Sequence, residues 1–304
     1  MPAPPRRARR RLLLVHSHPD DETITTGGTI ARYAADPDTS VTLVTCTLGE
    51  RGEVMVPELA GLTADQADQL GGYRIGELAG AAAALRLTDR RFLGGAGRWR
   101  DSGMVTLEGV LAAAPPAEQL HPRAFCADNQ RAAQIAALAE ILAEVAPQVV
   151  VGYDPSGGYG HPDHVRAHEI TMAAAAAAPG VRKVYWTVAP TADVSAGLDE
   201  LAGAAEHGLP WRLASPNELP CVPDDMVTTR VDVAPQLDAK IAALRAHATQ
   251  LTVWVGPPGS GKLAYALTNE IAQPVLRTES YTLVGAAGSV RPVRETDLFD
   301  GIED

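Results

Sequence analysis

The chain has 304 residues, of which 46% are hydrophobic and 21% charged, and its formal net charge is -11 at pH 7. These proportions are typical of a globular protein, and the length suits one large α/β domain or two small ones. The acidic balance argues against nucleic acid as the main partner, because phosphate binding requires a basic face. A membrane partner is not expected either, since no apolar stretch approaches the roughly 18 residues of a membrane span.

The N-terminal basic run, residues 6–11, is interpreted as part of a solvated, disordered tail over residues 1–10. It does not begin a signal peptide, because the apolar run behind it is short and meets His16. The sequence carries no signal for the number of subunits. The cysteines are odd in number and widely scattered, which indicates a reducing cytoplasm and argues against a disulfide framework or a thiolate metal site: Cys46, Cys126 and Cys221.

Strand and helix patterns alternate along the first 190 residues. Apolar runs predict strands at 12–15, 41–46, 91–93, 148–152 and 181–188. Longer periodic segments predict helices at 25–35, 64–85, 128–146 and 164–178. This alternation predicts an α/β fold with a Rossmann-like, mostly parallel sheet and helices on both faces. Residues 94–127, rich in Gly and Pro, are predicted to form a long loop.

The pattern weakens after residue 189. We expect a helix at 193–207, a strand at 226–233, a helix at 234–248 and further short strands after residue 250. No repeat or linker interrupts the chain. The sequence therefore predicts a single domain over residues 11–304, made of an α/β core (11–189) and a C-terminal subregion (190–304) that covers the sheet and completes the site.

The first chemically active cluster is His-Ser-His-Pro-Asp-Asp-Glu at residues 16–22, directly after the first predicted strand. Five ionisable groups in seven residues cannot be buried without a counter-charge, because an unpaired buried carboxylate is very costly. A divalent cation with imidazole and carboxylate ligands is the simplest counter-charge. The cluster also lies at the carboxyl end of a strand, where ligands bind in open α/β sheets.

The second cluster, Gly-Gly-Tyr-Gly-His-Pro-Asp-His at residues 157–164, follows the predicted strand 148–152. Its glycines allow a tight turn and a close approach to a ligand. If the two strands are parallel neighbours, this cluster lies beside the first. The pairing of His-Pro-Asp-Asp at 18–21 with His-Pro-Asp-His at 161–164 is far more specific than either motif alone.

With these two motifs the chain resembles the LmbE-like (PIG-L) family of metal-dependent N-acetylglucosaminyl deacetylases, which carry His-Pro-Asp-Asp-Glu and a downstream His-Pro-Asp-His. The resemblance covers about residues 11–300 with gaps. It is strongest to the mycothiol-pathway branch that deacetylates GlcNAc-inositol, through residues 45–50, 70–77 and 93–104. It implies a cytoplasmic hydrolase that removes acetate from the 2-acetamido group of this small amino sugar.

The resemblance also implies the residues of the metal site. The ligands would be His18, Asp21 and His164, which leave coordination positions open for water and a carbonyl oxygen. The ion would be one Zn²⁺ per subunit, with Fe²⁺ possible in the cell, because this ligand set suits both. Asp20 would be the general base that takes a proton from water.

Further roles follow from the same resemblance. His161 would be an imidazolium that stabilises the tetrahedral intermediate, and Asp163 would orient it and hold its charge. Tyr159 would donate to the developing oxyanion. Hydroxyl groups of the sugar need both donors and acceptors, and the residues that would contact them are Arg74, Asp101 and Glu53.

Three alternatives remain open at this stage, one of which is a sugar-binding module without catalytic activity. The first is the related amidase of mycothiol S-conjugates, which uses the same chemistry. That amidase has Pro in place of Gly160, which favours the deacetylase here, whereas residues 227–231 and 295–303 are more similar to the amidase.

His168, one helical turn after His164, is a possible extra ligand, and His247 is either near the site or structural.

The second alternative is a nucleotide-binding protein. Residues 256–262 match Gly-x-x-x-x-Gly-Lys and lie between a strand-like segment, 251–255, and a helix-like segment, 263–270. Leu263 stands where the magnesium-binding hydroxyl belongs, and the remaining chain is too short for a nucleotide domain. We therefore interpret the segment as a Gly/Pro loop.

Overall fold

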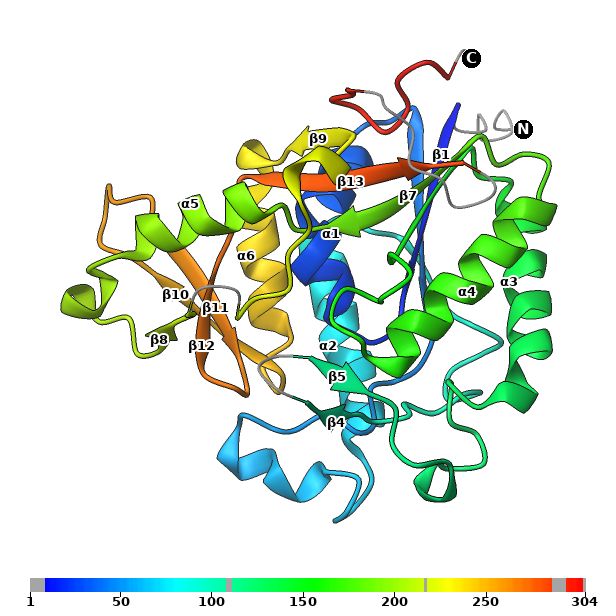
Figure 1. Cartoon of the computed structure of the whole chain (residues 1–304), viewed down its shortest axis with the longest axis horizontal. Helices are drawn as coiled ribbons and strands as arrows, with labels where there is room; N and C mark the ends of the chain where they lie inside the picture. The colour runs from blue at the N-terminus through cyan, green and yellow to red at the C-terminus, as the bar shows by residue number, and fades with distance from the viewer. Residues whose placement is uncertain (1–8, 108–110, 216–217, 286–293, 303–304) are drawn as a thin grey trace, which may run out of the picture.

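The main sheet has seven strands in the order β3-β2-β1-β6-β7-β13-β9 (Figure 1). The structure is a computed structural model that describes residues 9–107, 111–215, 218–285 and 294–302. Five strands are parallel: β1 (Arg10–His16), β2 (Thr39–Thr45), β3 (Asp89–Phe92), β6 (Val149–Gly152) and β7 (Lys183–Val188). Antiparallel pairing adds β13 (Thr278–Val284) to β7 and then β9 (Thr229–Asp232) to β13. The predicted mostly parallel sheet is confirmed.

The strand order reverses between β1 and β6. Leu14 of β1 lies between Leu43 of β2 on one side and Val151 of β6 on the other. From β1 the chain proceeds outward to β2 and β3, and it then returns to build β6 and β7 on the opposite side. Such a reversal leaves a crevice at the carboxyl ends of the two central strands. Both sequence motifs follow these two strands.

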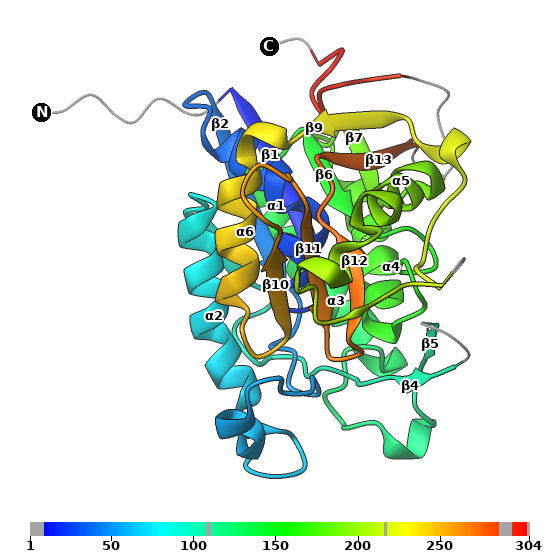
Figure 2. The same cartoon turned by 90° about the vertical axis from the view of Figure 1, so that its left-hand side faces the viewer.

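Helices cover both faces of the sheet (Figures 1 and 2). Leu12 and Leu14 of β1 belong to the core shared with α1 (Asp21–Ala34), α2 (Leu70–Ala84) and α6 (Leu237–Ala246). The alternate residues Leu13 and Val15 belong to the core shared with α3 (Arg131–Val145) and α4 (Pro162–Ala177). Alternate side chains of a strand point to opposite faces, so the continuous apolar run of β1 is the expected pattern for a strand covered on both sides.

The C-terminal part adds α5 (Thr191–Leu201) and a second sheet in the order β10-β11-β12-β8. Its strands are β10 (Leu251–Val255), β11 (Leu263–Leu267), β12 (Ile271–Pro274) and β8 (Arg212–Leu213). A small hairpin pairs β4 (Val105–Thr106) with β5 (Ala112–Ala113). The 3-10 helices are η1 (Pro57–Leu62), η2 (Ala117–Gln119), η3 (Asp128–Gln130), η4 (Ala204–His207), η5 (Asp224–Met226) and η6 (Ala234–Gln236).

Several predicted boundaries differ from the structure. The helix predicted from residue 64 begins at Leu70, because Asp68 has a left-handed backbone (φ 54°) that a helix cannot contain. The predicted tail of residues 1–10 lies outside the described residues up to residue 8, and β1 already begins at Arg10. The predicted loop 94–127 contains the β4–β5 hairpin, and residues 108–110 lie outside the described part. The domain boundary at 189 stays a prediction.

The helix-like segment 263–270 does not form a helix, which contradicts the nucleotide-binding alternative and confirms the interpretation of residues 256–262 as a Gly/Pro loop. Residues 263–267 form β11, which pairs antiparallel with β10. The Gly/Pro segment between them is a hairpin turn closed by a hydrogen bond from Gly256 N–H to the Lys262 carbonyl (2.9 Å). The Lys262 ammonium donates to the carbonyl of Ala202 (3.1 Å). A phosphate-binding loop requires a following helix N-terminus, which this hairpin lacks.

Within the described ranges, no helix combines the length and apolarity needed to cross a bilayer.

Candidate metal and catalytic site

The two motifs form the N-termini of α1 and α4. At α4, the His161 ring accepts the backbone N–H of Asp163 at Nδ1 (3.2 Å), and Pro162 occupies the first turn. Proline suits this position because its missing N–H would have no partner there. Asp20 directly precedes α1. Each helix N-terminus carries a partial positive charge, so both helices favour negative charge in the crevice.

Three side chains bring one donor atom each to a common point. His18 Nδ1 lies 3.2 Å from Asp21 Oδ2 and 3.3 Å from His164 Nε2. His164 Nε2 lies 3.3 Å from the same Asp21 oxygen. Ligand atoms around a tetrahedral zinc ion are separated by about 3.3–3.4 Å when the bonds measure about 2.0–2.1 Å. The spacing of these three atoms therefore fits a single small cation.

Other donor sets are close enough to hold a metal, namely His18 with His161 and His164, and His18 with Asp101 and Asp163. The second of these sets uses His18 Nε2, which lies 3.3 Å from Asp163 and 3.7 Å from Asp101. The Asp163 carboxylate is already occupied, because it accepts hydrogen bonds from the backbone N–H (3.0 Å) and the hydroxyl of Ser102. In the set with Asp21 all three donor atoms lie 3.2–3.3 Å apart, and Asp21 Oδ2 also accepts the backbone N–H of His18 (2.8 Å).

The second nitrogen of each histidine has a fixed acceptor. His164 Nδ1 lies 3.1 Å from the carbonyl of Gly157, so this nitrogen carries the proton and Nε2 presents its lone pair. His18 Nε2 faces Asp163 at 3.3 Å, which leaves Nδ1 for the common point. Outer hydrogen bonds of this kind orient imidazole ligands and raise their basicity.

The electrostatics of the cluster call for positive charge. Burial lowers the pKa of His18, but the carboxylates of Asp101, Asp163 and Asp21 outweigh burial and hold this pKa well above its usual value. Burial raises the pKa of Asp21, but His164 and His18 outweigh it and hold the pKa well below its usual value. A proton on the imidazole and a metal ion compete for the same lone pair. The residues present therefore fit a divalent cation.

Tyr153, at the end of β6, is a site residue that the sequence analysis missed. Its hydroxyl donates to Asp21 Oδ2 (2.9 Å) and accepts the backbone N–H of Ser17 (3.0 Å). Its ring stacks on His164 with centroids 4.3 Å apart. His16 Nδ1 lies 3.3 Å from the same hydroxyl, which makes His16 a supporting residue. Tyr153 thus contacts two of the three donor residues and holds their arrangement.

Tyr153→Phe is expected to lower zinc affinity roughly 10- to 100-fold, the usual effect of losing an outer hydrogen bond to a ligand. The ring stack on His164 is kept, so the change isolates the hydroxyl. Affinity can be measured by competition with a chromophoric chelator. Tyr33→Phe is the matched control, because the Tyr33 hydroxyl also donates to a carboxylate (Asp297, 2.8 Å) and accepts a backbone N–H. Equal zinc affinity in both variants would contradict the role of Tyr153.

Asp20 has an unusual backbone conformation and a protected carboxylate. Its φ is 132°, a region that favours glycine. Its side chain lies 3.1 Å from Arg74 Nη2. Burial raises the pKa of Asp20 to about 6, although the positive charge of Arg74 opposes the shift. A carboxylate with such a pKa is well matched to proton transfer near neutral pH.

Asp20→Gly is expected to be more stable than Asp20→Ala by about 1 kcal/mol, because only glycine relieves the backbone strain at this φ. Both variants lose the same carboxylate, so their difference reports the backbone alone. Chemical denaturation of the two proteins measures it. An alanine variant at least as stable as the glycine variant would show that the conformation carries no strain.

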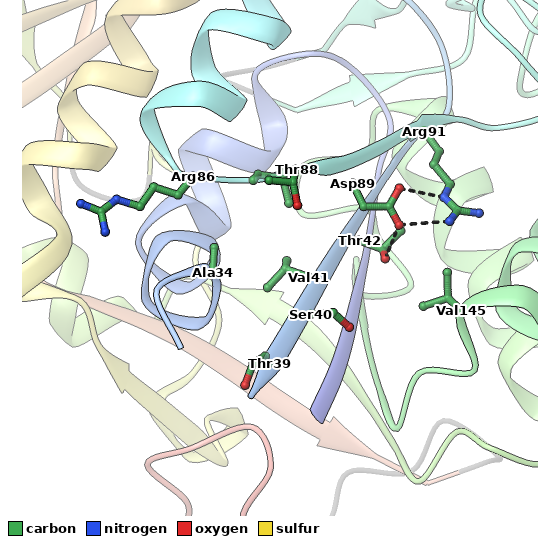
Figure 3. Close-up of a pocket in the computed structure, with 11 residues that line it drawn as sticks. Ala34, Thr39, Ser40, Val41, Thr42, Arg86, Thr88, Asp89, Arg91 and Val145 are labelled. Atoms are coloured by element: carbon green, nitrogen blue, oxygen red, sulfur yellow. Dashed lines mark hydrogen bonds and ion pairs between the residues drawn. The ribbon is translucent and has the colours of Figure 1, made fainter. Parts of the chain in front are cut away.

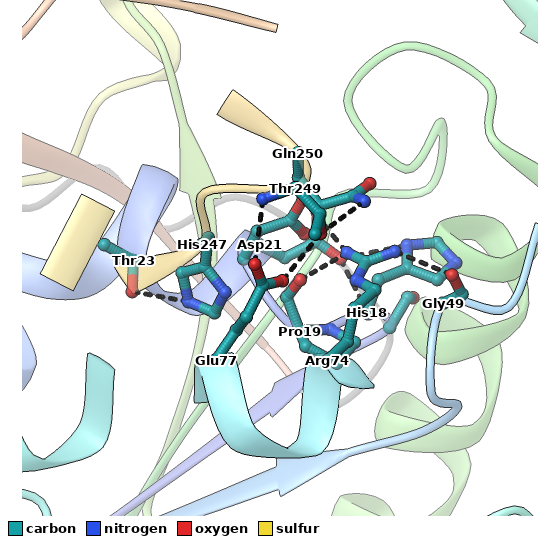
Figure 4. A network of polar contacts seen from close by, with 12 residues as sticks. His18, Pro19, Asp21, Thr23, Gly49, Arg74, Glu77, His247, Thr249 and Gln250 are labelled. Carbon is teal, nitrogen blue, oxygen red and sulfur yellow. Dashed lines mark hydrogen bonds and ion pairs between the residues drawn. The ribbon is translucent and has the colours of Figure 1, made fainter. Parts of the chain in front are cut away.

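The structure places Arg74, for which a substrate contact was predicted, beside Asp20. The side chain is buried, with 2% of its surface exposed. The guanidinium donates to the carbonyls of Gly49 (2.8 Å) and Pro19, and it pairs with Asp20. These partners hold the loop that precedes α1, and Figure 4 shows Arg74 beside Pro19 and Gly49. A contact between Arg74 and the sugar stays a prediction.

The predicted pairing of Asp163 with His161 is also different in the structure. The Asp163 carboxylate contacts His18 and Ser102, and only its backbone N–H reaches the His161 ring. Burial, followed by the neighbouring His18 and His164, lowers the pKa of His161 well below its usual value. This direction favours a neutral imidazole over the predicted imidazolium, and the catalytic role of His161 stays a prediction. Since Nδ1 accepts the Asp163 N–H, the ring proton resides on Nε2.

The remaining predicted residues lie around this centre. The ring of Tyr159 lies edge-on to His164, with centroids 5.2 Å apart, and burial raises the pKa of its hydroxyl well above the usual value. Asp101 is buried and accepts the backbone N–H groups of Arg51 (3.0 Å) and Gly103 (2.8 Å). Glu53 lies in an exposed loop, where its carbonyl accepts the Gln250 amide (2.9 Å). Substrate contacts of Asp101 and Glu53 stay predictions.

The candidate site does not coincide with the cavity in Figure 3. That cavity, of about 340 Å³, is lined by Thr39–Thr42 of β2, by Arg86 and by Asp89 and Arg91 of β3. These residues belong to the first half of β2 and to the segment around β3. The motifs follow the opposite, carboxyl ends of the strands, where the chemistry of an α/β sheet is expected.

Comparison with known proteins agrees with the geometry. The sequence model of the PIG-L family, described as GlcNAc-PI de-N-acetylase, matches residues 13–175. A protein of Saccharopolyspora erythraea named 1D-myo-inositol 2-acetamido-2-deoxy-alpha-D-glucopyranoside deacetylase 1 is 57% identical over 294 residues, covering 96% of this chain and 94% of its own length. A protein of Actinosynnema mirum, named as the same deacetylase without the numeral, is 56% identical over 292 residues, covering 96% and 97%.

Solved structures share the fold at lower identity. GalB, the 4-carboxy-2-hydroxymuconate hydratase of Pseudomonas putida KT2440, has a TM-score of 0.50 at 21% identity and covers 79% of both chains. At this identity the likeness concerns the fold alone.

Proposed function

Because the chain belongs to the PIG-L family of de-N-acetylases, we propose that it is a metal-dependent hydrolase that removes acetate from the 2-acetamido group of GlcNAc-inositol in mycothiol biosynthesis. The products are GlcN-inositol and acetate. The names of relatives that are 57% and 56% identical over nearly the whole chain support this substrate. The observation that carries the chemistry is the convergence of three donor atoms, 3.2–3.3 Å apart, beside the buried carboxylate of Asp20.

His18, Asp21 and His164 would hold one Zn²⁺ ion per subunit, or Fe²⁺ in the cell, since two imidazoles and one carboxylate suit both metals. When bound, such an ion acts as a Lewis acid that makes water more acidic and polarises a carbonyl oxygen. Tyr153 keeps the Asp21 carboxylate in place through its hydroxyl.

The chain supplies the proton transfers. The Asp20 carboxylate accepts a proton from the attacking water as the oxygen bonds to the acetamide carbon. The Nε2–H of neutral His161 donates to the carbonyl oxygen while negative charge develops there, and the Tyr159 hydroxyl is a second donor. The C–N bond then breaks, and the amine nitrogen takes up the proton that Asp20 received. Asp163 acts through His18 in this scheme, which differs from the role expected from the sequence.

Recognition of the sugar is assigned to Asp101 and Glu53. Their carboxylates and the nearby backbone can accept hydrogen bonds from hydroxyl groups, which glucosamine and inositol both present. Arg74 contributes indirectly, because its guanidinium is occupied by Pro19, Gly49 and Asp20.

Gly160 favours the deacetylase over the amidase of mycothiol S-conjugates. Its φ is 92°, and a Cβ atom at this position would lie 2.4 Å from the carbonyl oxygen of Ala112 in β5. Proline, the residue of the amidase branch, requires a φ near -65°, so this contact between the loop and the β4–β5 hairpin is specific to glycine.

Turnover of GlcNAc-inositol compared with that of a bimane conjugate of mycothiol tests the assignment. We expect kcat/KM to be higher for GlcNAc-inositol, with release of acetate in equal amount to the free amine. A strong preference for the conjugate would establish the amidase instead.

We further propose that the enzyme acts in the cytoplasm and that neither nucleic acid nor a membrane is a partner. The cysteines Cys46, Cys126 and Cys221 are all free thiols in the structure, which suits a reducing compartment.

A further inference from the structure

The strained backbone of Asp20 is held by hydrogen bonds to residues that closely follow it in the chain. Its N–H donates to Glu22 Oε2 (3.0 Å), and its carbonyl accepts the N–H groups of Thr23 (2.9 Å) and Ile24 (3.0 Å). The bonds from the carbonyl are ordinary bonds of the first helical turn. The bond from the N–H depends on the position of the Glu22 side chain. Strained conformations persist only where the surrounding structure enforces them.

Glu22 is in turn held by His247, a residue of the C-terminal part. The other carboxylate oxygen of Glu22, Oε1, lies 2.9 Å from His247 Nε2 and accepts the Thr23 hydroxyl (2.6 Å). Both side chains of the Glu22–His247 pair are buried, with 1% and 0% exposed. His247 Nδ1 has no hydrogen-bond partner among the described residues. Glu22 therefore connects His247 to the backbone of Asp20.

His247 itself is rigidly placed. It follows α6, and the next turn is anchored by Glu77 of α2, which accepts the backbone N–H (2.8 Å) and the hydroxyl (2.7 Å) of Thr249. Gln250 bonds the carbonyl of Glu53 (2.9 Å). Figure 4 shows His247 beside Thr23, with Thr249 against Glu77. The turn is thus fixed to α2 and to the loop after β2.

We propose that His247 is a positioning residue for Asp20, acting through Glu22. This inference rests on the base role of Asp20 proposed above. It extends the active site beyond residues 13–175, the part matched by the family model, and gives the C-terminal part a defined catalytic task. A displacement of about 1 Å in a catalytic group can cost roughly 100-fold in rate, so the chain from His247 to Asp20 matters for turnover.

Two amide substitutions separate the hydrogen bond from the mere presence of a polar side chain. The amide of Gln places its nitrogen near the position of His Nε2, whereas that of Asn reaches only the position of Nδ1. We expect His247→Asn to lower kcat roughly 10- to 100-fold with KM little changed. The kcat of His247→Gln should be roughly tenfold higher than that of His247→Asn. Equal kcat of the two variants, or His247→Asn as active as the unmodified enzyme, would overturn the proposal.

A matched control exists on α6, the helix that His247 follows. Lys240 of α6 pairs with Glu279 (2.6 Å), whose carboxylate accepts the N–H groups of Gly28 and Thr29 of α1. This pair is also buried and also joins α6 to α1, but it contacts α1 at Gly28 and Thr29, beyond Glu22. Lys240→Met should lower the melting temperature and leave kcat unchanged. If it lowered kcat as much as His247→Asn, the effect of His247 would be structural only.

The decisive experiment measures the effect of His247→Asn in a protein that already carries Asp20→Asn. If His247 acts through Asp20, His247→Asn removes no further activity once the base is gone. A loss of equal size in both backgrounds would overturn the positioning role. Should His247→Asn not fold, Glu22→Asp offers the same test, because it withdraws the carboxylate from the Asp20 N–H and leaves His247 in place. Full turnover of Asp20→Asn alone would contradict the base role of Asp20, and this outcome differs from each outcome that contradicts the positioning role of His247.

A readout without substrate completes the test. Hydrogen exchange of the Asp20 amide should accelerate in His247→Asn and stay slow in Lys240→Met, while bound zinc, measured by elemental analysis, is equal in both. Unchanged protection of this amide in His247→Asn would also overturn the proposal.

Discussion

Asp20→Asn is expected to lower kcat for GlcNAc-inositol by roughly a hundred- to ten-thousand-fold, the usual contribution of a general base. The amide has the shape of the carboxylate and can still accept a hydrogen bond from Arg74, which lies 3.1 Å away. It cannot take a proton from water. Steady-state assay of the released amine measures the loss, and elemental analysis should show the zinc content of the unmodified enzyme, because the donor atoms belong to other residues.

The pH profile gives an independent control. Burial raises the pKa of Asp20 to about 6, and Arg74 opposes the shift. The base must be ionised, so kcat/KM is expected to fall as the pH drops through this pKa. A bound cation favours the ionised form of Asp20, so this acidic limb of the pH profile should lie at or below pH 6. The residual activity of Asp20→Asn should lack the limb. A limb that persists there, or a variant with full activity, would assign the base to another group.

His164→Ala is expected to abolish measurable turnover and stoichiometric zinc binding together. The substitution removes one of three donor atoms and leaves Asp21 without one of its two neighbouring imidazoles, at 3.3 Å. Loss of a ligand from a three-residue site leaves too few protein bonds to retain the ion. Isothermal titration with zinc of the chelator-treated protein measures the binding, and assay before and after zinc is restored measures the activity.

Thermal unfolding provides the check for the same variant. A ligand that binds only the folded state stabilises it by mass action, so zinc should raise the melting temperature of the unmodified protein and not that of His164→Ala. His207→Ala, a change at an exposed histidine of η4, should behave like the unmodified protein. Retention of zinc and activity in His164→Ala would place the metal on another donor set, such as His18 with Asp101 and Asp163.

The sequence by itself determined the fold class and the chemical character of the site. Apolar runs at 12–15 and 148–152 predicted strands covered on both faces, because period and length are local properties of a strand. His18, Asp21 and His164 were predicted as ligands through the resemblance of their motifs to those of the LmbE-like (PIG-L) family. A cluster of buried ionisable groups needs a counter-charge wherever the chain places it, so the motif at residues 16–22 predicted a divalent cation.

Only the tertiary structure decided which groups pair. Packing buries Arg74 against Pro19, Gly49 and Asp20, contacts that its own segment of the sequence does not specify. The carboxylate of Asp163 bonds Ser102, 61 positions away, in preference to its neighbour His161.

Tyr153 carried no signal in its own segment, and the sequence left the role of His247 open between a place near the site and a structural one. They became visible only because strand order sets β6 beside β1 and α6 packs against α1. Hydrogen-bond partners and pKa shifts depend on three-dimensional distance and burial. A local sequence pattern specifies neither the distances nor the burial, so the hydrogen-bond partners and pKa shifts are decided by the fold.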